Sequence, residues 1–278
     1  MIFLEKIIPQ KPRVALVDLT GVIGGSLKPQ PYVDLLLGLR ETDWAQSVIL
    51  NIDSPGGTTW GSDHLRMGVQ RLAEEKPVVA FIRGLGASGG YMVAGAAQKI
   101  IASPSALVGS IGVISYHPLA HELFQRIGID FEVTKSTKLK DMGAFYREST
   151  EEEREKSQAL VDEYHESFVQ TVAKDRSLEL EDAHNLATGE VFTGNRAVEL
   201  KLVDEVGDFE YAKEIAANLG NVPHGQVTRS NPPRSLREMF AGSLSQNSAL
   251  SDAQVLLSNQ ILYLAPSFAQ GSLLKLLK

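Results

Sequence analysis

Apolar residues recur along residues 13–137 in short continuous runs that alternate with stretches of helical periodicity. Continuous runs rich in β-branched residues are typical of buried strands, and apolar positions three and four apart predict amphipathic helices. Strands are predicted at residues 13–24, 46–53, 77–84, 99–115 and 130–137, and helices at 31–43, 60–76, 88–98 and 118–128. The alternation predicts an α/β fold whose mainly parallel sheet is covered by helices on both faces.

A long charged segment at residues 151–176 opens the second half of the chain. Its apolar residues at helical spacing predict one long helix, and they are Leu160, Val161, Tyr164, Phe168 and Val172. The residues Ser149 and Thr150 before three glutamates predict an amino-terminal cap. Shorter helices are predicted at 178–186, 196–200 and 209–220.

The composition changes after Gly220, where Asn, Pro, Ser and Gln become frequent. Such composition is typical of poorly packed segments. We therefore predict a globular domain at residues 1–220 and a linker and tail at 221–278, partly helical or flexible. Within that tail, "AQVLLSNQILYLA" at residues 253–265 is a candidate docked helix.

Composition and charge exclude several functional classes. The chain has 278 residues, of which 43% are hydrophobic and 22% charged, as in soluble globular proteins. Its net charge of −7, without a basic run, argues against nucleic acid as a partner. The absence of cysteine excludes disulfides, thiolate metal sites and a cysteine nucleophile.

The amino-terminal apolar stretch is interrupted by Glu5 and Lys6 and is far shorter than the roughly 20 apolar residues that span a bilayer. We therefore expect neither a signal peptide nor a membrane anchor. The expected location is cytoplasmic or membrane-peripheral, with membrane association left open.

Three clusters of small residues follow successive predicted strands: "DSPGG", "RGLGASGGY" and "VGSIGV". The carboxyl ends of parallel strands are where α/β sheets build ligand sites. Glycines allow close approach to the backbone, so the N–H groups of Gly89 and of Gly56 or Gly57 can bind an oxyanion. The "PGG" edge can also hold an extended peptide.

Ser88 in "GASGGY" has two interpretations of similar weight. Serine is a favoured helix cap, and Ser88 precedes a predicted helix. A serine on a sharp turn between glycine-rich segments is also a candidate nucleophile, which requires a base. His117 is the best placed of six histidines, although it also fits a loop residue before a proline. The other candidate bases are Lys135, Lys138 and Lys140, because a buried lysine can lose its proton and serve a serine nucleophile.

Four ordered motifs, "DSPGG", "KPVVAFIRGLGASGGYMVA", "KIIASPSALVGSIGV" and "KLKDMGAFYREST", closely resemble the signal peptide peptidase SppA family in its short, single-repeat form. The resemblance covers about residues 14–217. It implies a ClpP/crotonase-like fold of repeated ββα units and a Ser–Lys dyad without metal or cofactor. By motif, Ser88 is the nucleophile, Lys140 the general base, and Ser110 the residue that orients the lysine. Lys135 and Lys138 are then surface residues.

The resemblance also implies substrates and partners. These are hydrophobic peptides, including remnant signal peptides, bound extended by a homo-oligomeric ring or dome in which Lys140 faces Ser88 of a neighbouring subunit. Gln98 stands where the family usually has aspartate, and Leu107 and Val108 replace its usual threonines. Two other functional classes remain open. One is a crotonase-type acyl-CoA enzyme, for which no suitable glutamate is seen, and the other is an inactive scaffold on the same fold.

Overall fold

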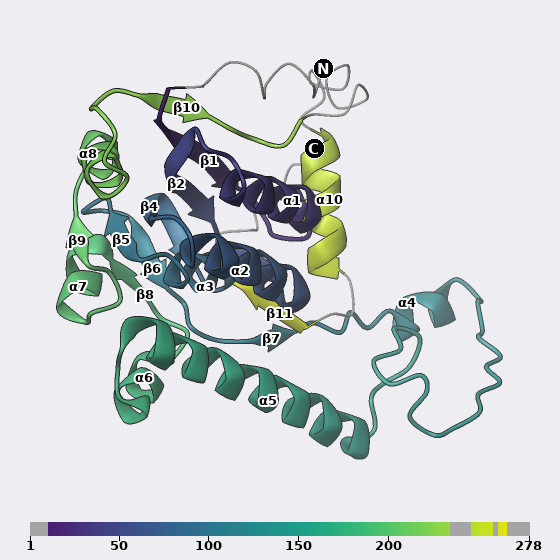
Figure 1. The fold of residues 1–278 in the computed structure, drawn as a ribbon. Helices are drawn as coiled ribbons and strands as arrows, with labels where there is room; N and C mark the ends of the chain where they lie inside the picture. Colours follow the sequence, from purple (N-terminus) through teal and green to yellow (C-terminus); the bar gives the residue numbers. More distant parts are fainter. Residues whose placement is uncertain (1–10, 234–245, 258–260, 266–278) are drawn as a thin grey trace.

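A parallel sheet forms the centre of the computed structural model, which describes residues 11–233, 246–257 and 261–265 (Figure 1). Eight strands of the described part belong to it. Its main strand order is β10 (Val227–Arg229), β1 (Arg13–Thr20), β2 (Ala45–Ser54), β4 (Val78–Ala87), β5 (Lys99–Ala102) and β9 (Glu205–Val206). Strand β6 (Leu107–Gly109) extends the sheet beside the end of β4 and pairs antiparallel with β8 (Val191–Thr193).

Side chains alternate between the two faces of the sheet, as the period of two in a strand requires. In β1, Ala15, Val17 and Leu19 pack into one core, whereas Val14 and Leu16 pack into another. The larger core lies under α1 (Pro29–Arg40), α2 (Thr59–Ala73), α3 (Gly89–Gly95) and α5 (Glu151–Arg176), and the smaller one under α8 (Phe209–Leu219). The predicted α/β fold with a mainly parallel sheet and flanking helices is thus confirmed.

Helix α5 begins where the sequence predicts. Thr150 Oγ1 accepts the Glu153 N–H at 3.3 Å, and a Glu153 carboxylate oxygen accepts the Thr150 N–H at 2.8 Å. This reciprocal capping box satisfies two backbone donors at the start of the helix. Two short helices, α6 (Leu180–Leu186) and α7 (Gly194–Glu199), connect α5 to the far edge of the sheet.

A second, antiparallel sheet contains β3 (Gly56–Thr58), β11 (Ile261–Leu264) and β7 (Ile114–Ser115), with β11 between the other two. Strand β11 comes from the segment for which a docked helix was one expectation. In the structure α10 (Gln246–Leu257) ends within that segment and β11 follows. The residues after Gly220 also supply β10, which pairs with β1.

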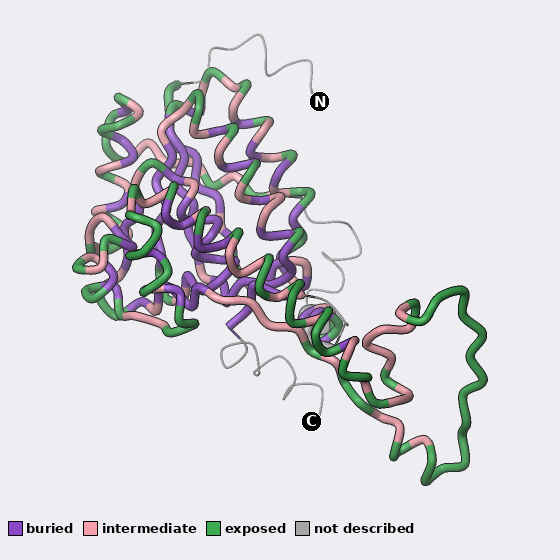
Figure 2. Tube along the Cα trace, turned by 90° about the horizontal axis from the view of Figure 1, so that it is seen from below, coloured by how far each residue is buried: buried purple, intermediate pink, exposed green. Residues whose placement is uncertain are grey.

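Residues 116–150, here named the arm, extend away from the sheet and carry one short helix, α4 (His121–Arg126) (Figure 1). Figure 2 shows that the arm is exposed along most of its length. The strand predicted at residues 130–137 is wrong, because the structure has no regular element there and all eight residues are exposed. A β-prone sequence forms no ladder without a neighbouring strand to pair with.

Candidate active site

Ser88 lies at the sharp turn between β4 and α3. Its backbone angles, φ 53° and ψ −119°, are rare for a residue with a side chain. The turn is held because the Ser88 N–H donates to the Gly109 carbonyl at 2.7 Å and the Ser88 carbonyl accepts the Met92 N–H at 2.9 Å. The side chain makes no capping hydrogen bond, and its hydroxyl donates to the Gly112 carbonyl at 3.4 Å. The cap interpretation of Ser88 therefore lacks the hydrogen bond that defines a cap.

The two glycine-rich turns meet beside Ser88. A Cβ atom added to Gly56 would lie 2.7 Å from the Gly89 nitrogen, and one added to Gly89 would lie 2.2 Å from Ser62 Oγ. Gly56 also has φ +91°, a conformation that favours glycine. Absent side chains thus let β3 and the start of α3 approach each other. Such closeness is what a shared oxyanion site for backbone N–H groups requires.

Ser110 follows β6, whose register places Gly109 opposite Ala87, directly before Ser88. Its φ is 50°, and its N–H donates to the Glu190 carbonyl at 2.6 Å. Ser110 borders a cavity of about 410 Å³ that is also lined by Gly112, Asp162, His165 and Leu264. The structure therefore brings Ser88, Ser110 and the glycine turns into one region at the carboxyl ends of the strands.

The histidines near this region contact other groups. His117 Nε2 lies 3.1 Å from Ser115 Oγ, and His165 Nε2 lies 3.1 Å from the Ala187 carbonyl oxygen. The hydroxyl of Ser88 donates to a backbone carbonyl instead of to a ring nitrogen. This geometry does not support a Ser–His pair.

Lys140 lies on the arm, in a turn where its N–H donates to the Thr137 carbonyl at 3.2 Å, and it is exposed. Figures 1 and 2 both show the arm leading away from the sheet that carries Ser88. Within one chain, the structure does not bring Lys140 and Ser88 together. The two neighbouring lysines are exposed and form ion pairs, Lys135 with Asp141 at 2.6 Å and Lys138 with Glu152.

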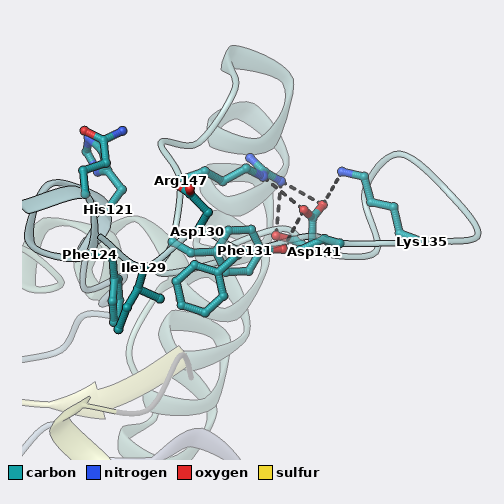
Figure 3. Close-up of a pocket in the computed structure, with 11 residues that line it drawn as sticks. His121, Phe124, Ile129, Asp130, Phe131, Lys135, Asp141 and Arg147 are labelled. Carbon is teal, nitrogen blue, oxygen red and sulfur yellow. Dashed lines mark hydrogen bonds and ion pairs between the residues drawn. The ribbon is translucent and has the colours of Figure 1, made fainter. Parts of the chain in front are cut away.

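The arm is ordered by its own charged and aromatic contacts. Arg147 bridges Asp141 at 2.8 Å and Glu153 at 2.5 Å, and Figure 3 shows Arg147 and Lys135 both directed at Asp141. Hydrogen bonds from Arg147 and Lys135 hold the pKa of the Asp141 carboxyl well below its usual range. Arg147 and the Thr150 backbone N–H lower the pKa of Glu153 to about 2. Four rings pack beside this network, those of Phe124, Phe131, Phe145 and Tyr146.

Strand β11 is the part of this region that the sequence analysis missed. A Cβ atom on Gly56 would lie 2.0 Å from the Tyr263 carbonyl oxygen, and one on Gly89 would lie 3.0 Å from the same atom. The available signal was the run "ILYL", whose β-branched and aromatic residues favour a strand. It was obscured by the apolar residues of the preceding helix.

Neither a metal site nor a membrane span is found in the described part of the chain. There, no three His, Asp or Glu side chains are placed to hold a metal ion. No helix of the same residues is long and apolar enough to cross a bilayer.

Comparison with known proteins shows which family this chain resembles. Residues 70–223 match the model of peptidase family S49. The chain is 37% identical over 196 residues to a candidate protease of Methanocaldococcus jannaschii, covering 70% of this chain and 63% of that protein. It is 33% identical over 244 residues to a candidate protease of Synechocystis, covering 87% of each. It is 32% identical over 224 residues to the chloroplastic serine protease SPPA of Arabidopsis thaliana, covering 79% of this chain and 33% of that protein.

Proposed function

Because the chain belongs to peptidase family S49, whose members have a ClpP/crotonase-like fold, we propose that it is a serine endopeptidase with Ser88 as nucleophile and Lys140 as general base. The observation that carries the proposal is the strained turn at Ser88. Its hydroxyl makes one long hydrogen bond, and the glycine turns adjoin it. Strained backbone is found where a fold must aim a reactive group.

The reaction forms an acyl-enzyme. Lys140 takes the proton of the Ser88 hydroxyl as Oγ bonds to the substrate carbonyl carbon, and the carbonyl oxygen becomes an oxyanion bound by N–H groups of Gly89 and of Gly56 or Gly57. When the peptide C–N bond breaks, the Lys140 ammonium returns the proton to the leaving amine. The neutral Lys140 amine then takes a proton from a water molecule as the water oxygen attacks the ester carbon. When the ester C–O bond breaks, the Lys140 ammonium returns this proton to Ser88 Oγ, and the carboxylic acid product leaves.

The separation of Ser88 and Lys140 within one chain leads us to include self-assembly in the proposal. A lysine acts as a base only as a neutral amine, which burial favours. Lys140 is exposed in one chain, so the arm of a neighbouring subunit would bring it to Ser88 and bury it. Support comes from exposed apolar residues of the arm that a partner can cover: Leu119, Leu123, Ile127, Ile129, Phe131, Val133 and Phe145. A homo-oligomeric ring or dome meets this need.

The proposed substrates are hydrophobic peptides in extended conformation, such as remnant signal peptides or unfolded polypeptides. The edge of β3 at Gly56 and Gly57, which β11 occupies in the structure, has backbone groups that can pair with such a strand. Action in the cytoplasm or at a membrane surface is part of the same proposal, and cell fractionation tests it.

Two experiments test the proposal. A fluorophosphonate probe should label Ser88, and Ser88→Ala should abolish labelling. Neither an acyl-CoA enzyme nor an inert scaffold has a reactive serine there, so labelling separates the peptidase from both. Absence of labelling in the cleavage-competent assembly refutes the role of Ser88 as nucleophile.

Complementation tests the base and the assembly together. Ser88→Ala and Lys140→Ala should each abolish cleavage of fluorogenic apolar peptides. Mixed oligomers of the two inactive variants contain some sites with both wild-type residues if the dyad forms between subunits, so mixing after dissociation should restore measurable cleavage. No recovery in verified mixed oligomers contradicts a dyad shared between neighbours, and retained activity in Lys140→Ala removes the assigned base.

A further inference from the structure

Strand β11 lies in the position that an extended peptide would take beside Ser88. It pairs antiparallel with β3 on one side, Tyr263 opposite Gly57 and Leu264 opposite Gly56, and with β7 on the other side. After the strand, the Ala265 N–H donates to the Pro55 carbonyl at 2.8 Å. Residues Ile261–Leu264 thus lie between β3 and β7, and the space that they fill between these two strands is here named the channel.

The side chains of β11 occupy apolar sites on both sides of the channel. Leu262 and Leu264 pack in a small core with Val22, Val255 and Ile114. Tyr263 points to the opposite side, where its ring centroid lies 4.8 Å from that of Phe168 and its hydroxyl donates to the Tyr164 carbonyl at 3.2 Å. Alternate residues of one strand therefore fill separate sites, as in peptide recognition by strand addition.

Occupation of the channel coincides with burial of the nucleophile. Ser88 has no exposed surface. The Tyr263 carbonyl lies against Gly56 and Gly89 on one side, while Leu264 borders the cavity of Ser110 and Gly112 on the other. A substrate strand and β11 cannot share the edge of β3, because each edge N–H and C=O pairs with one strand at a time.

We propose that residues Ile261–Leu264 are a built-in competitor, which occupies the place of the extended substrate peptide in the channel between β3 and β7. This inference rests on the proposed function, since it names what regulates access to that site. The sequence "ILYL" then describes the preferred ligand, which has aliphatic side chains at alternate positions and an aromatic one between them. Substrate reaches Ser88 only when β11 leaves.

A reversible crosslink tests the competition. Ile261 and Ser115 face each other across the β11–β7 ladder. Opposed Cα atoms in such ladders are about 4.5–5.5 Å apart, a separation that a disulfide spans. The chain has no cysteine, so Ile261→Cys with Ser115→Cys introduces a single pair, and the wild-type chain is the matched control for the oxidant. Oxidation of the double variant should lower fluorophosphonate labelling and peptide cleavage at least tenfold, and reduction should restore both.

A binding assay gives a readout without catalysis. A fluorescent peptide of residues 261–265 should bind a Ser88→Ala chain ending at Leu257 at least tenfold more tightly than full-length Ser88→Ala. The same peptide with Tyr263→Pro, which lacks one backbone donor, should bind weakly. Thermal melting checks that the shortened chain folds. If the shortened chain does not fold, labelling and cleavage by the crosslinked full-length chain test the competition instead.

The outcomes separate this inference from the proposed function. If the oxidised and reduced double variants are both labelled, and to the same extent, with the disulfide verified, the competitor is overturned and β11 is only a structural strand. If the peptide binds tightly and the crosslink blocks that binding, while no form of the protein cleaves substrate, the result supports competition by β11 for the channel and refutes the proposed peptidase activity. Cleavage that is unaffected by the crosslink refutes the competitor and leaves the peptidase standing.

Discussion

Gly57→Ala tests whether the "PGG" turn is fixed by contact between backbones. A Cβ atom on Gly57 would lie 1.9 Å from the Ile23 carbonyl oxygen and 2.6 Å from both the carbonyl carbon and the nitrogen of Ile23. Backbone atoms cannot rotate away as a side chain can, so the segment at Ile23 must move. Overpacking of this kind costs about 1–3 kcal/mol.

Movement of Ile23 also disturbs two hydrogen bonds, one from its N–H to the Gly56 carbonyl at 2.8 Å and one from the Thr58 N–H to its carbonyl at 2.9 Å. Each such bond contributes about 0.5–1.5 kcal/mol. The free energy of unfolding should therefore fall by about 2–6 kcal/mol if both are lost, since the steric and hydrogen-bond costs add.

Gly38→Ala is the matched control. Gly38 is exposed in α1, and a Cβ atom there meets nothing within 4 Å. Alanine in a helix interior is more stable than glycine by about 0.5–1 kcal/mol, so this variant should gain that amount. Urea unfolding followed by far-UV circular dichroism measures both variants. Neutral surface substitutions change the free energy of unfolding by up to about 0.5 kcal/mol. If the free energy of unfolding of Gly57→Ala differs from that of the wild type by less than about this amount, with an unchanged dependence on urea concentration, the backbone argument is refuted.

Three smaller effects follow from single contacts. Tyr91→Phe should lower the free energy of unfolding by about 1 kcal/mol in urea melts, because the buried Tyr91 hydroxyl donates to the Leu202 carbonyl at 2.8 Å. Thr150→Ala should cost about 1 kcal/mol in the same assay through loss of the α5 cap, and Thr150→Ser should not. The pKa of Glu153 is lowered to about 2 from its ordinary value of 4.5, so its carboxylate stabilises the fold above about pH 4.5 and loses that effect as pH falls towards 2. The melting temperature should therefore fall over this range, and less steeply in Glu153→Gln, with equal slopes contradicting the role of the Arg147 pair.

The parts of the fold predicted correctly are those with strong local signals. Strand β1 has a continuous apolar run, and the start of α5 has Thr150 followed by Glu153, so each is specified by its own residues. The turn at Ser88 is predicted because serine and glycine follow a predicted strand. These features depend little on distant parts of the chain.

The errors arose where the outcome depends on a distant partner. Residues 130–137 contain β-prone residues such as Phe131 and Val133, but no strand lies beside them. Strand β11 pairs with β3 and β7, which both lie far away in the sequence. The strand propensity of a residue measures how well its side chain fits a pleated, partly buried surface. The rest of the fold determines whether such a surface is present.

The arm shows that the order of motifs along the chain does not determine whether the proposed pair, Ser88 and Lys140, meets within one chain. Motifs that act together need not meet within one chain, and Ser88 and Lys140 lie on separate parts of this one. Arg147 fixes the arm through Asp141 and Glu153, so the arm has a defined shape although none of its residues is fully buried. An ordered extension with exposed apolar side chains is better suited to contact with another protein surface than to folding back onto its own sheet. The sequence names both members of the proposed dyad, and the proposed assembly is what would bring them together.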